Sequence, residues 1–375
     1  MRSTPQEIEH LPVMAALATV SEVSGTQPLD HEESLQQFTV GTRKSDLALK
    51  QTDLVVEALL AARPDYKYQV KARDTAAGDI DKVTPFKDMP VKNLWTHELE
   101  TLMVEGSLDI LVHSLKGNSF LSSPRCFSNE HVQDVPTQLP PNCEIGAVLP
   151  REDPRDAFVL RAGRQNSSLA KLPLGSVVGT SSIRRTAQIA LKYPHLRIQD
   201  MRGNVGTRLR KLDAEDSPFD AIILAAAGLI RLDLGRRISH FLDSSDGNML
   251  YAVGQGAIGI ENRSDDLRVK ETLRLVNHMP TFLAITCERS LLRFLEGGCS
   301  APLGVETRWV KGRGGKKSDS ALLMKAIVVS VDGTSSVEVE MEEEIESVEE
   351  AEAFGVKVAT ELCTKGADKI LAEVS

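Results

Sequence analysis

The stretch Val178–Arg185 constrains the fold of this chain more than any other. A short apolar run, one glycine and three hydroxyl residues precede a helical spacing of apolar side chains that begins at Ile183. This order predicts a strand, a tight turn and a helix whose first turn is capped by Thr180 or Ser181. The N–H groups and dipole at such a helix end favour a bound anion, although a plain capped helix could have the same sequence.

The same order of elements recurs near the start of the chain. A strand at Phe38–Val40 leads through a glycine turn to Arg43 and to Ser45, which takes the cap position of a predicted helix. Arg43 gains nothing structural in the turn, so we interpret it as a ligand-binding residue. Arg184 and Arg185 likewise bring charged donors that suit carboxylate or phosphate groups.

Other predicted strands also end at basic residues. The apolar run Leu108–Leu115 reads as a buried parallel strand and ends at Lys116. A later strand ends just before Arg202, and a strand at Ala221–Ala227 is followed by Arg231. Ligands of open α/β sheets bind at the carboxyl ends of strands, so this pattern predicts α/β domains with an anion site.

The last part of the chain has a different pattern. It predicts an amphipathic helix at Pro280–Leu295, a two-glycine stop and then a small antiparallel sheet. The predicted strands are Leu303–Thr307, Leu322–Val331 and Ser336–Glu344, with a hairpin turn at Asp332-Gly333 and a closing helix at Ala351–Leu371. This is the order of a small α+β domain.

Charge and cysteine content exclude several classes of protein. The net charge is −9, yet residues 184–237 hold eleven Lys or Arg against six Asp or Glu, which favours a small anionic ligand over nucleic acid. The five cysteines are dispersed without a CxxC pair, which argues against a disulfide framework or a zinc site and for a reducing compartment.

The beginning of the chain predicts a flexible tail. The first 36 residues hold one arginine and six acidic residues, unlike an Arg-rich, acid-poor mitochondrial presequence. No apolar run is long enough to span a bilayer. We therefore expect a cytoplasmic protein without a membrane or nucleic-acid partner.

Taken together, these segments closely resemble porphobilinogen deaminase, also called hydroxymethylbilane synthase, over residues 37–375. The matching segments are Gly41–Ser45, His113–Lys116, Gly179–Arg185, Arg202–Asn204, Thr207–Asp213, Ala252–Gly256 and Glu296–Ser300, in that order. The loop Thr84–Glu100 resembles the fungal branch of the family.

The resemblance implies an α/β fold with two doubly wound domains similar to periplasmic binding proteins, plus a smaller α+β domain with an antiparallel sheet. The expected division is a tail over 1–36, domain 1 over 37–151 and 254–277, domain 2 over 152–253, and domain 3 over 278–375. It implies a monomeric transferase of tetrapyrrole and heme biosynthesis. Such an enzyme joins four porphobilinogens head to tail with loss of ammonia and releases hydroxymethylbilane.

The family match also implies site residues. A dipyrromethane cofactor would be joined to Cys299 by a thioether. Carboxylates of cofactor and substrate would be held by Arg43, Ser45, Thr180, Ser181, Ser182, Arg184, Arg185, Arg202, Asn204, Arg208 and Arg231, assisted by Gln51, Lys92 and Lys116. No metal is implied.

The cysteines can also be weighed from the residues alone. Two glycines and a serine flank Cys299 and leave its thiol accessible, whereas a lone cysteine is more often a buried apolar residue. The other four, Cys126, Cys143, Cys287 and Cys363, are interpreted as structural.

The sequence departs from the family after Lys116. The family pattern would continue directly into an aspartate, whereas here the seventeen residues Gly117–Gln133 stand before Asp134. Asp134 is the best candidate for the catalytic carboxylate that stabilises the cationic intermediate. We therefore expect the family fold with impaired turnover. The alternatives are a non-catalytic two-domain anion-binding protein or an inactive isoform.

Overall fold

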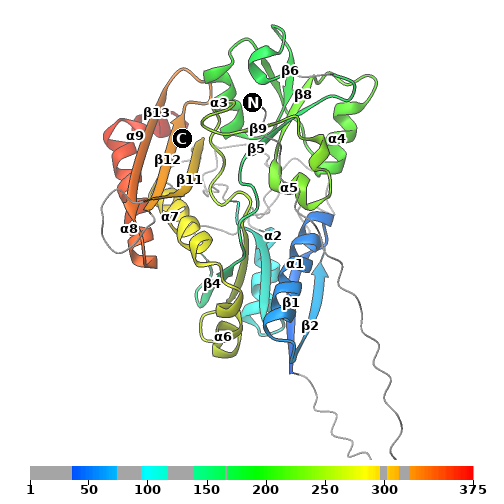
Figure 1. Cartoon of the computed structure of the whole chain (residues 1–375), viewed down its shortest axis with the longest axis vertical. Helices are drawn as coiled ribbons and strands as arrows, with labels where there is room; N and C mark the ends of the chain where they lie inside the picture. Colours follow the sequence, from blue (N-terminus) through cyan, green and yellow to red (C-terminus); the bar gives the residue numbers. More distant parts are fainter. Residues whose placement is uncertain are drawn as a thin grey trace, which may run out of the picture. The chain divides into compact units, whose positions relative to one another are not determined.

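The computed structural model describes residues 36–73, 94–116, 139–164, 167–295, 302–311 and 321–374. The predicted tail up to residue 35, the insertion Gly117–Gln133, the glycine stop after the Pro280–Leu295 helix, Lys92, Cys126, Asp134 and Cys299 lie outside these ranges. Within them the strands form three sheets, and Figure 1 shows the third of them in orange, on the opposite side from the blue strands of the first.

The first sheet has the strand order β2-β1-β3-β10-β4. Its strands are β1 (Gln36–Arg43), β2 (Tyr66–Arg73), β3 (Ile110–Ser114), β4 (Cys143–Val148) and β10 (Ile258–Arg263), and its helices are α1 (Asp46–Ala62), α2 (Leu94–Val104) and α6 (Leu267–Val276). Strand β1 runs parallel to β2 and β3, whereas β10 is antiparallel to β3 and β4. The carboxyl ends of β1 and β3 therefore meet at one sheet edge, where Arg43 ends β1 and Lys116 follows β3.

The second sheet has the order β7-β6-β8-β5-β9. Its strands are β5 (Asp156–Leu160), β6 (Val177–Gly179), β7 (Arg197–Gln199), β8 (Ala221–Ala225) and β9 (His240–Leu242), and its helices are α3 (Ile183–Lys192), α4 (Val205–Asp213) and α5 (Ala226–Arg231), with short 3-10 turns at Leu169–Lys171 and Gly235–Arg237. Alternate residues of its strands enter two apolar cores: Phe158 and Ile223 lie in one, and Ala157 and Ile222 in the other. Burial on both faces explains the continuous apolar runs in these strands.

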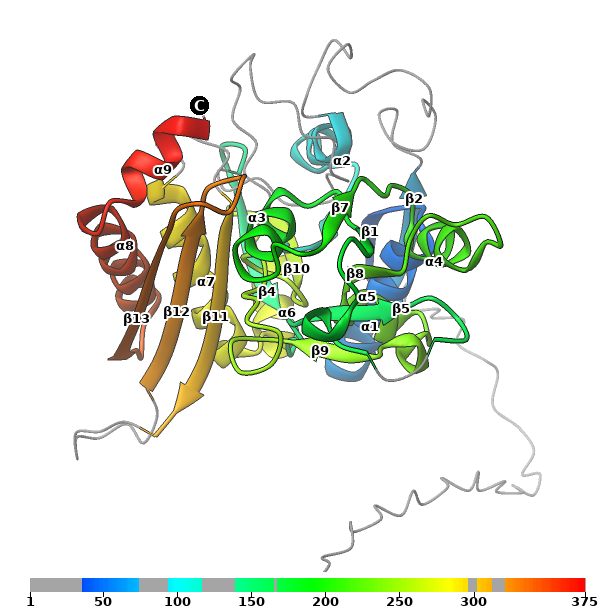
Figure 2. The ribbon, with the colours of Figure 1, turned by 90° about the horizontal axis from the view of Figure 1, so that it is seen from above.

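The third sheet is antiparallel, with the order β11-β12-β13. Its strands are β11 (Leu303–Val310), β12 (Ala321–Val329) and β13 (Ser336–Glu344), and its helices are α7 (Met279–Leu295), α8 (Val348–Thr364) and α9 (Ala367–Val374). Met324 and Val328 of β12 pack in one core with α7, α8 and α9, while Ile327 and Val329 pack against Ala187 of α3 (Figure 2). One face of β12 therefore packs on the helices of its own sheet, and the other face packs on α3, a helix of the second sheet.

The hairpin turn between β12 and β13 lies at Asp332-Gly333, as predicted. Gly333 has φ +74°, and a Cβ atom built on it would lie 2.5 Å from the backbone nitrogen of Leu191 in α3. Only glycine fits this turn without displacing its neighbour, because both the conformation and the close approach exclude a side chain. The turn is thus a second contact between the third sheet and α3.

The predicted fold class is confirmed, with corrections to individual elements. The two larger sheets contain both parallel and antiparallel strand pairs. The predicted helix Ala351–Leu371 is wrong: it is two helices, broken at Gly366, whose φ is +101°. The strand predicted over Ala221–Ala227 ends at Ala225, because α5 begins directly after it. Strands β9 and β10 were not predicted.

Two segments join the first and second sheets, and we call them the crossing segments: residues 149–155 and 252–257. Glu288 of α7 lies against both of them with a fully buried carboxylate. Its Oε1 accepts hydrogen bonds from Arg151 Nη1 and Thr307 Oγ1, each at 2.6 Å, and its Oε2 accepts from Gly254 N at 2.7 Å. One carboxylate thus holds both crossing segments against the third sheet.

Among the described helices, none combines the length and the apolar character needed to cross a bilayer.

Candidate active site

Serine side chains cap the helices that follow β1 and β6. Ser45 Oγ accepts a hydrogen bond from Ala48 N at 3.3 Å at the start of α1. At the start of α3 the cap is Ser182, whose Oγ accepts from Arg185 N at 3.4 Å. The prediction of Thr180 or Ser181 as the cap is wrong, because the turn after Gly179 is longer than expected. Thr180 Oγ1 instead accepts from Ser182 N at 3.2 Å, and Ser181 Oγ donates to Met201 O at 2.8 Å.

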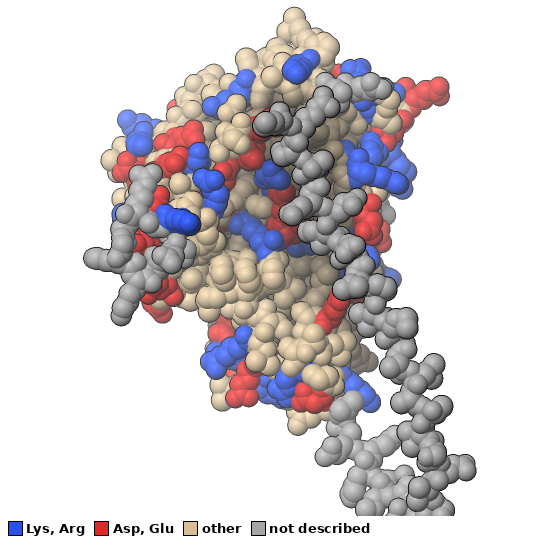
Figure 3. Space-filling view, viewed as in Figure 1, with Lys and Arg blue, Asp and Glu red and all other residues tan. Residues whose placement is uncertain are grey.

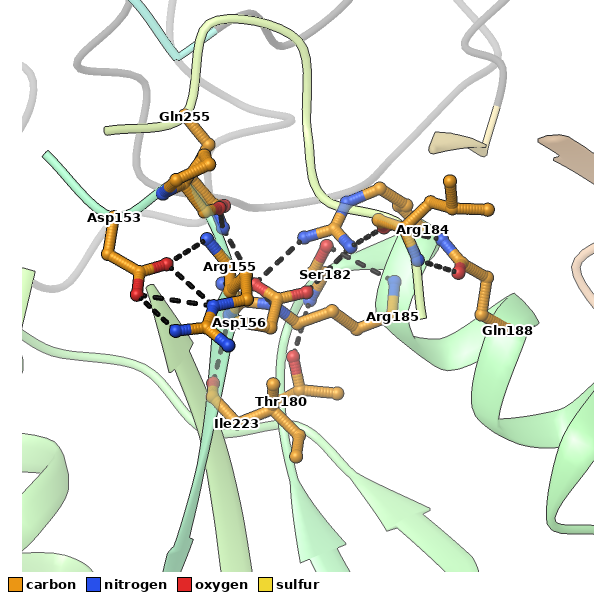
Figure 4. Close-up of polar contacts among 12 residues, drawn as sticks. Asp153, Arg155, Asp156, Thr180, Ser182, Arg184, Arg185, Gln188, Ile223 and Gln255 are labelled. Carbon is orange, nitrogen blue, oxygen red and sulfur yellow. Dashed lines mark hydrogen bonds and ion pairs between the residues drawn. The ribbon is translucent and has the colours of Figure 1, made fainter. Parts of the chain in front are cut away.

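Arg184 and Arg185 converge on one buried carboxylate, that of Asp156 at the start of β5 (Figure 4). Arg184 Nη1 donates to Asp156 Oδ2 at 2.7 Å, and Arg185 Nη2 donates to Oδ1 at 2.9 Å. Each guanidinium also donates to a backbone carbonyl, Arg184 to Leu250 and Arg185 to Ile223. The sequence predicted ligand-facing arginines, whereas here most of their donors go to the protein.

The positive charge of the two arginines is only partly neutralised by Asp156. Burial alone would raise the pKa of the Asp156 carboxyl, but the two guanidinium groups hold that pKa well below its usual value. Two positive charges therefore face one negative charge. Arg184 Nε is buried without a hydrogen-bond partner in the part of the chain that the structure describes. A buried donor of this kind is costly unless an acceptor reaches it, and an anionic ligand could supply that acceptor.

Arg231 forms a second cationic site, half-buried, with a buried Nε atom. It lies on α5, and its Nη2 donates to Gly256 O in the second crossing segment at 2.8 Å. Its Nε has no hydrogen-bond partner within the described ranges. Burial lowers the pKa of Arg231 to about 10, against the opposing charge of Glu152. A carboxylate from a ligand would stabilise the charged form of a guanidinium that has lost this much solvent.

The predicted residues around α4 are more exposed. Asn204 caps α4, accepting a hydrogen bond from Thr207 N at 2.8 Å. Arg208 Nε donates to Gly203 O at 2.7 Å. The Arg202 side chain is 47% exposed and pairs with Asp200 at 2.7 Å, so it lies at the surface.

In the first sheet, the predicted residues follow the edge that β1 and β3 share. Arg43 is buried with 8% exposure, Gln51 is buried on α1 with 3%, and Lys116 is half-buried two residues after β3 ends. On the face shown in Figure 3, basic and acidic side chains are interspersed. The cationic groups placed so far in the candidate site are individual arginines, of which Arg43, Arg184 and Arg185 are buried.

Sequence reasoning missed Asp156 and Gln255. Gln255 Nε2 donates to Asp156 Oδ1 at 2.9 Å and to Pro154 O at 2.7 Å. The signals were present: Asp156 is a charged residue at the head of an apolar strand, and Gln255 is a long polar residue between two glycines. Neither signal names a partner, because the contacts join residues 99 positions apart.

The donors of this site fit a polyanionic organic group. They are guanidinium N–H groups, hydroxyls and helix N-termini, and two arginine Nε atoms still lack acceptors among the described residues. The described ranges contain no group of three or more His, Cys, Asp or Glu residues arranged to hold a metal ion.

The three described cysteines are poor nucleophiles. Burial raises the pKa of Cys143 to about 11 and raises the pKa values of Cys287 and Cys363 as well. Because the thiolate is the reactive form, these thiols are largely unreactive near neutral pH. The structural role predicted for them agrees with this chemistry.

Solved structures with a similar arrangement are distant. One is the probable amino-acid ABC transporter extracellular-binding protein YtmK of Bacillus subtilis, with 10% identity, a TM-score of 0.36, and 64% of this chain and 90% of that chain covered. Another is the periplasmic aliphatic sulphonate binding protein SsuA of Escherichia coli, with 14% identity, a TM-score of 0.32, and 69% and 70% covered.

Comparison by sequence gives closer relatives. The family description "Porphobilinogen deaminase, dipyromethane cofactor binding domain" matches residues 38–125 and 130–271, and "Porphobilinogen deaminase, C-terminal domain" matches 282–364. Porphobilinogen deaminase of Yarrowia lipolytica is 46% identical over 347 residues, covering 91% of this chain and 94% of the relative. That of Saccharomyces cerevisiae is 40% identical, covering 90% and 96%. The chain therefore belongs to the porphobilinogen deaminase family.

Proposed function

We propose that this protein is a transferase that joins four porphobilinogen molecules head to tail, loses ammonia at each step and releases hydroxymethylbilane, a precursor of heme and other tetrapyrroles. Family membership supports this reaction. The observation that carries it is the set of buried arginine donors, since porphobilinogen brings two carboxylates per ring. Such carboxylates can supply the acceptors that Arg184 Nε and Arg231 Nε lack among the described residues.

The cofactor is a dipyrromethane held through Cys299, and when bound it supplies the pyrrole end to which substrate units are added. We assign its carboxylates, and those of the substrate, to the residues predicted from the family match. Asp156 orients Arg184 and Arg185. Ser45 and Ser182 stand at the N-termini of α1 and α3, where the helix dipole favours an anion. Asp134 stabilises positive charge on the pyrrole ring that reacts and accepts or returns its proton.

Cysteine chemistry supports Cys299 as the attachment site. Cys143, Cys287 and Cys363 have raised pKa values, which makes their thiols weak nucleophiles. Of the two remaining cysteines, Cys126 and Cys299, the latter lies in the segment that resembles the attachment site of the family.

We also propose a domain division, an oligomeric state and a cellular location for this protein. We assign a tail to 1–36, domain 1 to 37–151 and 254–277, domain 2 to 152–253 and domain 3 to 278–375. The protein acts as a monomer in the cytoplasm, on a small-molecule substrate. A non-catalytic anion-binding role is disfavoured, because its relatives over nine-tenths of the chain are named as deaminases.

The test of this function uses the purified chain and porphobilinogen. We expect hydroxymethylbilane to form with four ammonia molecules released for each product molecule. Intact-protein mass spectrometry is expected to show a mass excess equal to two linked pyrroles. A chain that binds porphobilinogen, releases no ammonia and has the mass of its sequence would support the anion-binding alternative instead.

The insertion gives a separate prediction. Removing Gly117–Gln133 restores the direct link from Lys116 to the aspartate and is expected to raise kcat by about 100-fold, since a misplacement of about 1 Å can cost that much. The fold should tolerate either form, because closing a loop of this length costs only about 2 kcal/mol more than closing a short one. Steady-state kinetics of the two forms provide the measurement.

The matched control is Asp134→Asn in the shortened chain, which should cancel the gain. Equal turnover with and without the seventeen residues would show that they do not disturb the catalytic carboxylate.

A further inference from the structure

The Asp156 carboxylate is the centre of a buried polar network that the family match does not include. It accepts from Arg184 through Nη1 and Nη2, at 2.7 and 3.3 Å, and from Arg185 through Nε and Nη2, at 3.1 and 2.9 Å. All three side chains are at least nine-tenths buried. With its acceptors used in this way, Asp156 fixes the planes of both guanidinium groups.

Gln255 connects this network to the crossing segments. Its amide nitrogen donates both to Asp156 Oδ1 at 2.9 Å and to Pro154 O at 2.7 Å, and the residue is 1% exposed. Its backbone carbonyl accepts from Arg151 Nε at 2.9 Å, and Arg151 pairs with Glu288. In Figure 4 the Gln255 side chain reaches Asp156 from the opposite side to the two arginines.

We propose that Asp156 and Gln255 are positioning residues: Asp156 orients Arg184 and Arg185 toward a carboxylate of the cofactor or substrate, and Gln255 couples that orientation to the two crossing segments. The identity of the bound anion rests on the proposed function, whereas the network itself does not. Gln255 belongs to the second crossing segment and bonds to Pro154 and Arg151 of the first. Binding an anion at the arginine pair and the conformation of these segments therefore influence each other.

A glutamate at position 255 tests the coupling through its proton. The charged groups around this position are Asp156, Arg184 and Arg185, with Arg151 on the Gln255 carbonyl and Arg231 and Glu152 at Gly256. Ionised, the new carboxylate would face Asp156 and repel it; protonated, it would donate a hydrogen bond as the amide does. Burial and the like charge of Asp156, which Gln255 contacts directly, raise the pKa of such a group, whereas Arg184 and Arg185 on the other side of Asp156 lower it (Figure 4). We take burial and Asp156 as the larger effect, so we expect the group to take up a proton as the pH is lowered through the assay range.

We therefore expect Gln255→Glu to raise the KM for porphobilinogen relative to wild type by about tenfold at pH 8 and by less than about threefold at pH 6, with kcat changing less than KM. The matched variant Gln255→Met has no proton to regain and should show the same deficit at both pH values. If the rise in KM over wild type has the same pH dependence in both variants, the proposed coupling through Gln255 is wrong.

Asp156→Asn tests the orienting carboxylate by a readout other than activity. We expect less than about half of the purified variant to carry the covalent cofactor mass, because unoriented arginines bind its carboxylates poorly. Asp213→Asn is the matched control, since Asp213 forms a bidentate pair with Arg237 in the same α/β part, away from this network. Equal cofactor content in the two variants, each measured beside its own melting temperature, would overturn the role of Asp156.

Wild-type protein is measured in parallel to separate this inference from the proposed function. If wild type makes no hydroxymethylbilane, the proposed function fails, and the coupling is then read from the rise in melting temperature that porphobilinogen produces in wild type, Gln255→Glu and Gln255→Met at each pH. If that rise has the same pH dependence in all three proteins, the coupling fails as well.

Discussion

Replacing Cys299 with serine is expected to leave a chain with the mass of its own sequence and to lower hydroxymethylbilane production by on the order of 10³-fold or more. The cofactor is the point to which substrate is added, so a chain that cannot hold it has no acceptor. A serine hydroxyl does not ionise near neutral pH and is a far weaker nucleophile than a thiol, so it does not replace the thioether. Intact-protein mass and a product assay provide the two measurements.

Cys143→Ser and Cys363→Ser are the matched controls. Both thiols have raised pKa values in the structure, so both variants should keep the mass excess and the wild-type rate. A Cys299→Ser protein that still carries two linked pyrroles would exclude Cys299 as the attachment site. The same mass measurement on Cys126→Ser would then test the remaining cysteine outside the described residues.

The parts of the fold that were predicted correctly depend on local sequence. Ser45 caps α1 because a short hydroxyl side chain can accept from an N–H group three residues ahead, which is a rule with a range of one turn. The run of apolar residues that predicts β12 and the glycine turn that follows it are equally local signals. The break at Gly366 is also local, yet the apolar spacing on both sides of it is helical and concealed it.

The parts that were not predicted depend on partners distant in sequence. Strand β10 is central in its sheet, but its sequence includes Glu261 and Asn262, and both are buried. Glu261 Oε2 lies 2.9 Å from His113 Nε2 of β3, so the polar neighbour of this buried carboxylate comes from another strand. A single sequence read in order does not reveal such a pair.

The candidate site shows the same division. The turn after β6 and its arginines were identified from their order in the chain, because strand ends and helix starts are where anions bind. The orientation of Arg184 and Arg185 was not predictable, since Asp156 precedes them by 28 and 29 residues. Sequence therefore predicted which residues make the candidate site, and the structure shows which groups orient Arg184 and Arg185.

Changing Glu288 to glutamine is expected to lower the free energy of unfolding by about 3–5 kcal/mol, the cost of leaving a buried charge without its partner. The Arg151 guanidinium loses its counter-charge but keeps its burial, and burial by itself opposes its charged form, lowering its pKa. A neutral amide also cannot accept from Arg151, Thr307 and Gly254 at once, because one of its two ends is a donor. Differential scanning calorimetry should show a melting temperature lower by on the order of 10 °C.

Glu352→Gln is the matched control. Glu352 of α8 pairs at 2.7 Å with Arg293 of α7, the helix that carries Glu288, and 48% and 38% of the two side chains are exposed. An exposed pair of this kind is worth about 0–1 kcal/mol, so the same chemical change should barely move the transition. If both variants have the same melting temperature, the buried pair contributes no more to stability than an exposed pair does. If only Glu288→Gln is destabilised, replacing both Arg151 and Glu288 with methionine should recover part of the loss, because the uncompensated charge is then removed together with its partner.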